Sequence, residues 1–125
     1  MPIEILYKEE AFKIIGICME VHRELGLGFH EFIYQEALEI EFKLQGIPFV
    51  REQEYKVFYK GKQLSKTFKA DFVVFDKIVL EIKAKSEIIE EHEIQTLNYL
   101  ACSKLKLGII ANFGAKSFQQ KRIIR

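Results

Sequence analysis

The feature that most constrains the fold is the segment 70–84, an almost continuous apolar run with a turn near its middle. Asp76 and Lys77 separate two stretches rich in Val, Ile and Phe, a pattern that predicts a hairpin of two buried β-strands. Glu81 and Lys83 interrupt the second of these strands, and because side chains alternate along a strand they share one face. A carboxylate and an ammonium group therefore point the same way from an otherwise apolar strand.

The residues alone leave two interpretations of Glu81 and Lys83 open. In the first, they form an ion pair at a solvated sheet edge, where charged residues are common. In the second, Glu81 is a ligand of a divalent cation, since hard cations such as Mg²⁺ prefer carboxylate oxygens. Lys83 would then orient a water molecule or stabilise charge on a phosphate.

The remaining secondary structure is predicted from hydrophobic periodicity and from turn residues. Helices are expected at 8–25, 30–45 and 87–102, with Ser86 as the N-cap of the third. Strands are expected at 49–59, 63–75, 78–84 and 105–112, with a short last strand at 118–124 as an addition. The order ααβββαβ predicts an α/β fold with a mixed four-stranded sheet flanked by helices. A chain of 125 residues has the length of one domain, residues 1–125.

The apolar positions also predict which side of each N-terminal helix packs on the core. For the first helix the predicted core residues are Ala11, Ile14, Cys18, Val21 and Leu25, with Phe12, Ile15 and Met19 widening the stripe. For the second helix they are Ile33, Ala37, Ile40 and Leu44.

Composition excludes several classes of protein. No apolar run approaches the ~20 residues that a membrane helix needs. Cys18 and Cys102 lie far apart without a Cys-x-x-Cys pair, which favours a reduced, cytoplasmic compartment and disfavours a structural zinc site. Neither a Gly-x-Gly-x-x-Gly nor a Walker motif occurs, which argues against the common nucleotide-binding folds.

Charge is distributed unevenly along the chain. Residues 1–54 hold 11 acidic and 5 basic side chains, whereas residues 55–85 hold 3 acidic and 8 basic ones. The basic residues of the second segment are Lys56, Lys60, Lys62, Lys66, Lys69, Lys77, Lys83 and Lys85. They form either a solvated sheet face with protective lysines or a surface that faces phosphates.

Two motifs connect the chain to a known family. Asp71, followed ten residues later by Glu81-x-Lys83, resembles the hairpin motif of the PD-(D/E)XK nuclease superfamily, with Ala70 where the superfamily name has Pro. Gly28, Glu31 and Tyr34 match the pattern that names the GxxExxY proteins, a branch of that superfamily. Further stretches that look like that branch are 21–26, 34–38, 46–49, 97–100 and 110–114, so that the resemblance covers residues 8–124.

The resemblance implies a restriction-endonuclease-like fold and a Mg²⁺- or Mn²⁺-dependent phosphodiesterase that acts on nucleic acid. Asp71 and Glu81 would hold the metal, with the Ile82 carbonyl completing the set and Glu31 supporting the same or a second ion. Lys83 would position the attacking water and stabilise charge on the phosphate.

A second group of residues would support this site. Gln95 and Tyr99 resemble the Gln-x-x-x-Tyr element of RecB-type nucleases, and the resemblance implies contact with substrate or with the catalytic carboxylates. Tyr34 shares a helix face with Glu31 and is expected to support it. His92 is not expected to be a catalytic base, and His22 is expected to be structural.

The rival interpretation is a non-catalytic module that binds nucleic acid or protein on a nuclease fold, because fold does not fix function. Presence of Asp71, Glu81 and Lys83 together favours an enzyme, since a retired site has no need of all three. We expect nucleic acid as the partner, DNA ahead of RNA, and no membrane. The sequence leaves open whether two copies of the chain form a homodimer.

The proposed site also demands a particular hairpin. A two-residue turn at Asp76 and Lys77 would pair Phe75 with Ile78 and would place Asp71 opposite Ile82, on the wrong face. Bulges re-aim side chains beside active sites. We therefore predict a loop of odd length or a bulge between residues 70 and 80.

Overall fold

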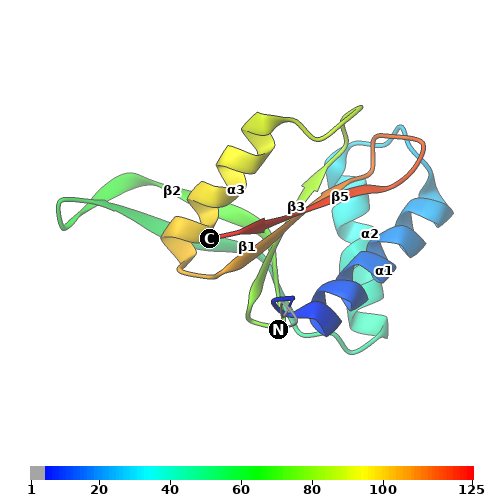
Figure 1. The fold of residues 1–125 in the computed structure, drawn as a ribbon, viewed down its shortest axis with the longest axis horizontal. Helices are drawn as coiled ribbons and strands as arrows, with labels where there is room; N and C mark the ends of the chain where they lie inside the picture. The colour runs from blue at the N-terminus through cyan, green and yellow to red at the C-terminus, as the bar shows by residue number, and fades with distance from the viewer. Residues whose placement is uncertain (1–4) are drawn as a thin grey trace.

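The structure is a computed structural model that describes residues 5–125. Its elements are α1 (Lys8–Leu25), α2 (Glu31–Leu44), β1 (Phe49–Tyr59), β2 (Lys62–Val74), β3 (Ile78–Lys83), α3 (Glu90–Ser103), β4 (Leu107–Asn112) and β5 (Gln119–Ile124). Figure 1 shows them as a sheet with α1 and α2 gathered at one end and a long β1–β2 ribbon projecting at the other. Among the helices of this described part, none is long and apolar enough to cross a membrane.

The five strands form one mixed sheet in the order β1-β2-β3-β4-β5. β3 and β4 are parallel and are connected through α3, whereas the other neighbouring strands are antiparallel. The predicted α/β class and the mixed sheet are confirmed. The sheet has five strands rather than four, because the C-terminal segment pairs with β4 from Leu107↔Ile124 to Asn112↔Gln119.

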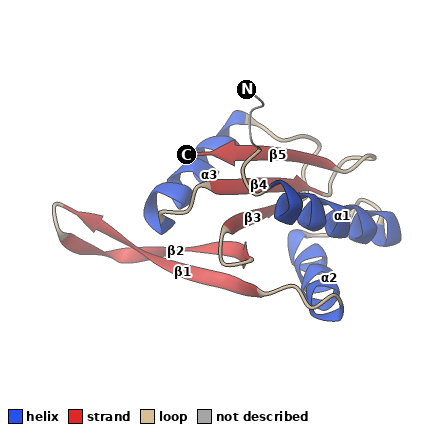
Figure 2. Cartoon of the chain, turned by 60° about the horizontal axis from the view of Figure 1, so that its bottom comes forward, coloured by secondary structure: helices blue, strands red, loops and turns tan. Residues whose placement is uncertain are grey.

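Helices cover both faces of the sheet (Figure 2). On one face, Ile78, Leu80 and Ile82 of β3 pack in the main core with α1 and α2. On the other face, Val79 packs in a smaller core with Leu100 of α3. Glu81 and Lys83 alternate with the main-core residues, and so they emerge on the α3 face.

The predicted core face of α2 is wrong at Ile40 and Leu44, whereas Ala37 packs against the core while half-buried. Tyr34, Leu38 and Phe42 are the buried residues of this helix, while Ile40 and Leu44 are 55% and 74% exposed. Aromatic rings bury more area than aliphatic side chains, and Phe42 packs against two other phenylalanine rings of the core. The helix is therefore rotated towards its aromatic residues.

Two smaller expectations are also corrected. On α1, Phe12 and Met19 are exposed, because Ile17 takes part in the core instead. The third helix begins at Glu90, so Ser86 is not its N-cap. Ile89 occupies that position, and its N–H donates to Nδ1 of His92 at 3.2 Å.

The hairpin between β2 and β3 has the predicted odd loop. Val74 pairs with Ile78, so Phe75, Asp76 and Lys77 form a three-residue connection. Phe75 and Asp76 both adopt positive φ values, of 57° and 58°. This register places Asp71 across from Glu81, and the prediction of an odd-length loop is confirmed.

The β1–β2 ribbon changes face at Asp71. Ala70 belongs to the smaller core on the α3 face, whereas Phe72, two residues later, belongs to the main core. In a regular strand these two side chains would share one face. Across from Asp71, Glu52 of β1 has a φ of 55°. The left-handed Glu52 is the local distortion that accompanies the change of face.

Replacing Glu52 by glycine is expected to raise the free energy of unfolding by up to about 1 kcal/mol, because only glycine adopts a positive φ without steric cost. Glu52→Val should lower it, since β-branched residues are poorly tolerated there. The measurement is urea unfolding followed by circular dichroism.

The matched control is Glu54→Gly, which lies two residues along the same strand. Glycine in an ordinary strand position lowers stability by roughly 0.5–1 kcal/mol. Equal destabilisation by Glu52→Gly and Glu54→Gly would contradict the left-handed conformation of Glu52.

Candidate active site

The side chains of Asp71 and Glu81 replace part of the backbone ladder between β2 and β3. The regular pairing ends at Phe72↔Leu80. Beyond it, the Asp71 N–H donates to Oε2 of Glu81 at 2.9 Å, and the Ile82 N–H donates to Oδ2 of Asp71 at 2.7 Å. Each carboxylate is thus fixed by a backbone group of the opposite strand, and the two acids are held side by side where the strands separate.

Burial raises the pKa of both carboxyl groups, and the charge of Asp71 adds to the rise for Glu81. Glu81 is only 2% exposed. Burial, followed by the charge of Asp71, raises the pKa of Glu81 well above its usual range. Burial also raises the pKa of Asp71, although the hydrogen bond from Ile82 opposes the change. A solvated-edge ion pair is therefore the wrong interpretation of Glu81, which lies on a central strand.

Lys83 extends from the same face of β3 and is held by α3. Its Nζ donates to Oε1 of Gln95 at 3.0 Å. Within the described residues Lys83 forms no salt bridge with Asp71 or Glu81. Its positive charge nevertheless opposes the rise in the pKa of both acids. An ammonium group has three donor hydrogens, so Lys83 retains donors for a ligand beside the two carboxylates.

Tyr99 lies near the carboxylates and is fixed by the ribbon. Its ring stacks on Phe68 of β2 with centroids 4.4 Å apart, and Phe68 in turn stacks on Tyr55 of β1. Burial, with smaller contributions from the charges of Glu81 and Asp71, raises the pKa of Tyr99 to about 12. The predicted pair of Gln95 and Tyr99 is thus placed beside the acids and the lysine.

The Gly28–Tyr34 segment forms a second wall of the site. Gly28 has a φ of 112°, which favours glycine. The Tyr34 hydroxyl donates to the Gly26 carbonyl at 2.6 Å and accepts from the Phe29 N–H at 3.3 Å. Tyr34 is fully buried, so it supports the loop that leads to Glu31 at the start of α2.

Glu31 is close enough to affect the acids electrostatically, since its charge contributes to the raised pKa of Asp71. Among residues 5–125, however, no group of three His, Cys, Asp or Glu side chains is arranged to hold a metal ion. The structure therefore brings Asp71 and Glu81 together, and the metal role of Glu31 stays a prediction.

Asn112, a buried residue that the sequence did not single out, anchors the chain after Lys83. Its Oδ1 accepts from the N–H groups of Lys85 and Gly114, and its Nδ2 donates to the Lys85 carbonyl and to Gln119. A Cβ on Gly114 would collide with the backbone of Lys85. A polar residue at the end of the apolar strand 107–111, followed closely by glycine, was the available signal.

The two histidines near these elements have structural contacts. Nδ1 of His92 accepts a hydrogen bond from the Ile89 N–H. Burial, followed by the charge of Lys83, lowers the pKa of His92. His22 is buried and hydrogen-bonds through Nε2 to the Ala115 carbonyl at 2.9 Å. The contacts of His22 agree with the structural role expected for it, and the role of His92 stays a prediction.

The chemistry of the donor set fits a hard divalent cation. Asp71 and Glu81 offer carboxylate oxygens, and Ile82, which contacts Asp71 through its N–H, offers a backbone carbonyl. Mg²⁺ is commonly held by one or two protein carboxylates and keeps several waters. A cation would stabilise the ionised forms of two neighbouring acids with raised pKa values, because it offsets the repulsion between their negative charges.

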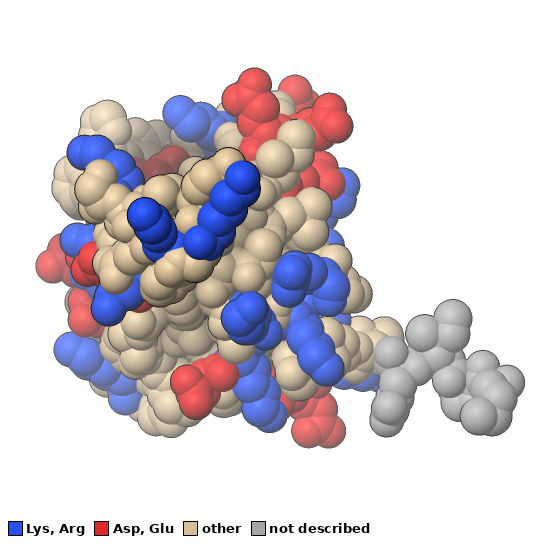
Figure 3. Space-filling view, turned by 90° about the vertical axis from the view of Figure 1, so that its left-hand side faces the viewer, with Lys and Arg blue, Asp and Glu red and all other residues tan. Residues whose placement is uncertain are grey.

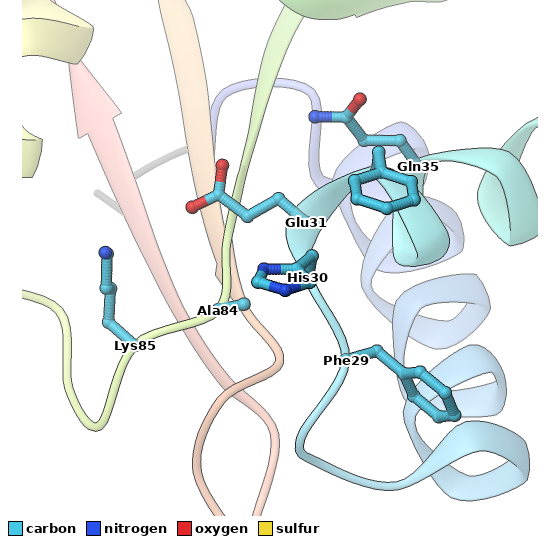
Figure 4. A pocket seen from close by; sticks show the side chains of 7 residues that line it. Phe29, His30, Glu31, Gln35, Ala84 and Lys85 are labelled. Carbon is cyan, nitrogen blue, oxygen red and sulfur yellow. The ribbon is translucent and has the colours of Figure 1, made fainter.

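A cavity of about 460 Å³ lies next to this site. Figure 4 shows its two walls, with Glu31 and Gln35 on α2 and with Ala84 and Lys85 on the segment after β3. Because Ala84 and Lys85 directly follow Lys83, the cavity continues the site along the chain.

Comparisons with known proteins give a family and a fold. Residues 8–125 match the model of a family described as the PD-(D/E)XK nuclease superfamily. The crystal structure of SSO0001 matches with a TM-score of 0.62 and 22% identity over 76% of this chain and 50% of that chain. An alkaline exonuclease from Laribacter hongkongensis (LHK-Exo) matches with a TM-score of 0.45 and 12% identity over 98% and 72%.

The chain spans half the length of SSO0001, and at this identity the likeness bears on the fold alone. It agrees with the mixed α/β architecture described above. A comparison with curated proteins finds no match.

The raised pKa of Glu81 predicts how stability depends on pH when no metal is added. At neutral pH Glu81 keeps its proton in the folded protein and loses it in the unfolded chain. The free energy of unfolding therefore falls as the pH rises above about 4.3, the ordinary pKa of Glu. Glu81→Gln should reduce this decline, leaving the smaller part that comes from Asp71, and should be more stable than the wild type at pH 8 by at least about 1.4 kcal/mol, the equivalent of one pKa unit.

Urea unfolding in EDTA at several pH values measures this difference. Glu54→Gln, which changes an exposed acid on β1, is the control and should leave the pH dependence as it is. A wild-type stability that is flat or rises between pH 5 and pH 8, with Glu81→Gln parallel to it, would contradict the raised pKa of Glu81.

Proposed function

Because the chain belongs to the PD-(D/E)XK nuclease superfamily, we propose that it is a divalent-metal-dependent nuclease that hydrolyses phosphodiester bonds in nucleic acid. The observation that carries this proposal is the pairing of the Asp71 and Glu81 carboxylates through reciprocal backbone hydrogen bonds, with Lys83 on the same face of β3. We further propose that the chain belongs to the GxxExxY branch, on its Gly28, Glu31 and Tyr34.

Asp71 and Glu81 would hold Mg²⁺ or Mn²⁺, with the Ile82 carbonyl beside them. When bound, such an ion supplies a Lewis acid for the phosphoryl group. The two backbone N–H donors keep the carboxylates in place before any ion binds, and this lowers the reorganisation that binding requires. Glu31 would act from the adjacent wall, through its charge on Asp71.

Lys83 would position the attacking water and stabilise the negative charge that develops on the phosphate. Gln95 holds the ammonium group from the α3 side, so its direction is set before substrate arrives. A fixed positive charge in a partly buried site stabilises a developing charge more strongly than one in bulk water.

The burial of the two acids disfavours the rival interpretation of a non-catalytic binding module. Burying a carboxylate without an ionic partner reduces stability, and Glu81 is 2% exposed and forms no salt bridge among the described residues. A binding module would gain nothing from this cost, whereas a bound cation would offset it.

The β1–β2 ribbon would contribute to binding of the substrate backbone. Five of its lysines are exposed, namely Lys56, Lys60, Lys62, Lys66 and Lys69. Figure 3, which looks at the end from which the ribbon projects, shows many Lys and Arg side chains on this face. Lys77 has a different role, because it pairs with Glu10 of α1 at 2.9 Å. We propose nucleic acid as the partner, with DNA ahead of RNA.

Calorimetric titration with Mn²⁺ tests the metal site. The wild type should bind the ion with an affinity that increases with pH, because protons compete for Glu81. The combined variant Asp71→Asn and Glu81→Gln should lose this binding, whereas Glu52→Gln, which changes an exposed acid on β1, should keep it. Equal Mn²⁺ affinity in the wild type and the double variant would overturn the metal role of both residues.

Cleavage assays test the role of Lys83. With Mn²⁺ and labelled DNA and RNA substrates, Lys83→Ala should lower kcat by a factor of about 10²–10³, the usual loss when one charge-stabilising donor is removed. Its Mn²⁺ affinity and its melting temperature should remain close to those of the wild type. The control is Lys106→Ala, an exposed lysine next to the opposite end of the β3–β4 pair. Near wild-type cleavage by Lys83→Ala would refute this role.

A further inference from the structure

The cavity between the start of α2 and the segment after Lys83 has features that the metal site does not use. Its lining includes Phe29, Phe32, Gln35 and Lys85. Its volume of about 460 Å³ lies within the range of small-molecule sites. The cavity is open to solvent, and Glu31 and Ala84 join it to the candidate active site (Figure 4).

Two large apolar side chains at this cavity are exposed, although the core is close by. Phe32 is 60% exposed and Phe29 is 46% exposed. The ring of Phe32 lies nearly parallel to that of His30, with an angle of 8° between the planes and 5.9 Å between the centroids. The loop before α2 and the first turn of α2 thus present aromatic surface to solvent at the edge of the proposed catalytic centre.

The polar groups of the cavity match a nucleotide. Lys85 is exposed and supplies a positive charge two residues after Lys83, where it can reach a neighbouring phosphate. The Gln35 side chain keeps its N–H donors for the edge of a base, while its Oε1 accepts from Arg51 at 3.4 Å. Aromatic rings bind bases of any sequence by stacking, because every base has a π-face.

We propose that this cavity is a subsite for one unpaired base of the nucleic-acid substrate, which stacks on Phe32 while Lys85 contacts the adjoining phosphate. The inference rests on the proposed function and adds a substrate class to it. A base inside a duplex has both faces covered by its neighbours, so it cannot stack on Phe32 without leaving the helix. The protein therefore prefers single-stranded nucleic acid, or a frayed or unpaired end, over an intact duplex.

The test compares Phe32→Ala with Phe12→Ala. Both residues are exposed phenylalanines, but Phe12 lies on α1 at a separate groove and is 79% exposed. Both variants carry Lys83→Ala and are studied with Mn²⁺, and gels check that the probe stays intact. The probe is a short fluorescein-labelled oligothymidylate, and its binding is followed by fluorescence anisotropy.

Phe32→Ala is expected to weaken binding of the oligothymidylate at least about fivefold, the lower end of the effect of removing one stacking ring. Phe12→Ala should leave it unchanged. A second probe of the same length, made of abasic residues, keeps the phosphates and lacks the bases. Phe32→Ala should not alter its binding, whereas Lys85→Ala should weaken the binding of both probes.

The outcomes separate the subsite from the nuclease proposal. If the parent protein binds the oligothymidylate but Phe32→Ala has no effect, or weakens the abasic probe equally, the base subsite is wrong and the nuclease proposal stands. The base subsite is also wrong if the parent protein prefers a duplex of the same sequence to the single strand. If the wild type neither binds nor cleaves any nucleic acid with Mn²⁺, both proposals fail.

Discussion

The reciprocal hydrogen bonds between Asp71 and Glu81 are the constraint on which the candidate site depends. Two buried acids repel each other and favour protonation, yet each is fixed here by a backbone N–H of the opposite strand. This arrangement is possible because the regular β2–β3 ladder ends one residue earlier, at Phe72↔Leu80. The apolar residues on both faces of β3 supply the stability that offsets the cost. The site is thus a local loss of sheet pairing that the surrounding core tolerates.

A chain of contacts connects the Gly28–Tyr34 segment to Lys83. Tyr34 holds the loop through the Gly26 carbonyl and stacks on Phe113, with centroids 4.7 Å apart. The N–H of Phe113 donates to the Lys83 carbonyl, and Asn112 fixes the backbone of Lys85. The motif tyrosine therefore acts on the site through packing. This explains why a fully buried residue belongs to a motif that otherwise lies at the surface.

Much of the fold follows from local sequence, and the errors have physical causes. The order of elements and the odd loop after Val74 could be predicted, because alternation in a buried strand admits few registers. The core face of α2 could not, since its apolar residues occupy more than one side and only packing against Phe72 selects the side with Phe42. The sequence marks Asn112 only as a polar residue at the end of an apolar strand, and its role could not be predicted because its hydrogen bonds reach Lys85, 27 residues away.

The change of face at Glu52 and Asp71 connects the site with the surface that would bind substrate. Before this point β2 pairs with β1, and after it β2 pairs with both β1 and β3. Asp71 therefore lies where β2 and β3 separate. The change of face also directs the ribbon and its exposed lysines away from the body of the protein (Figure 1). Backbone strain of about 1–2 kcal/mol at Glu52 is a small cost for a distortion that accompanies both features, and strained residues persist where the surrounding structure fixes them.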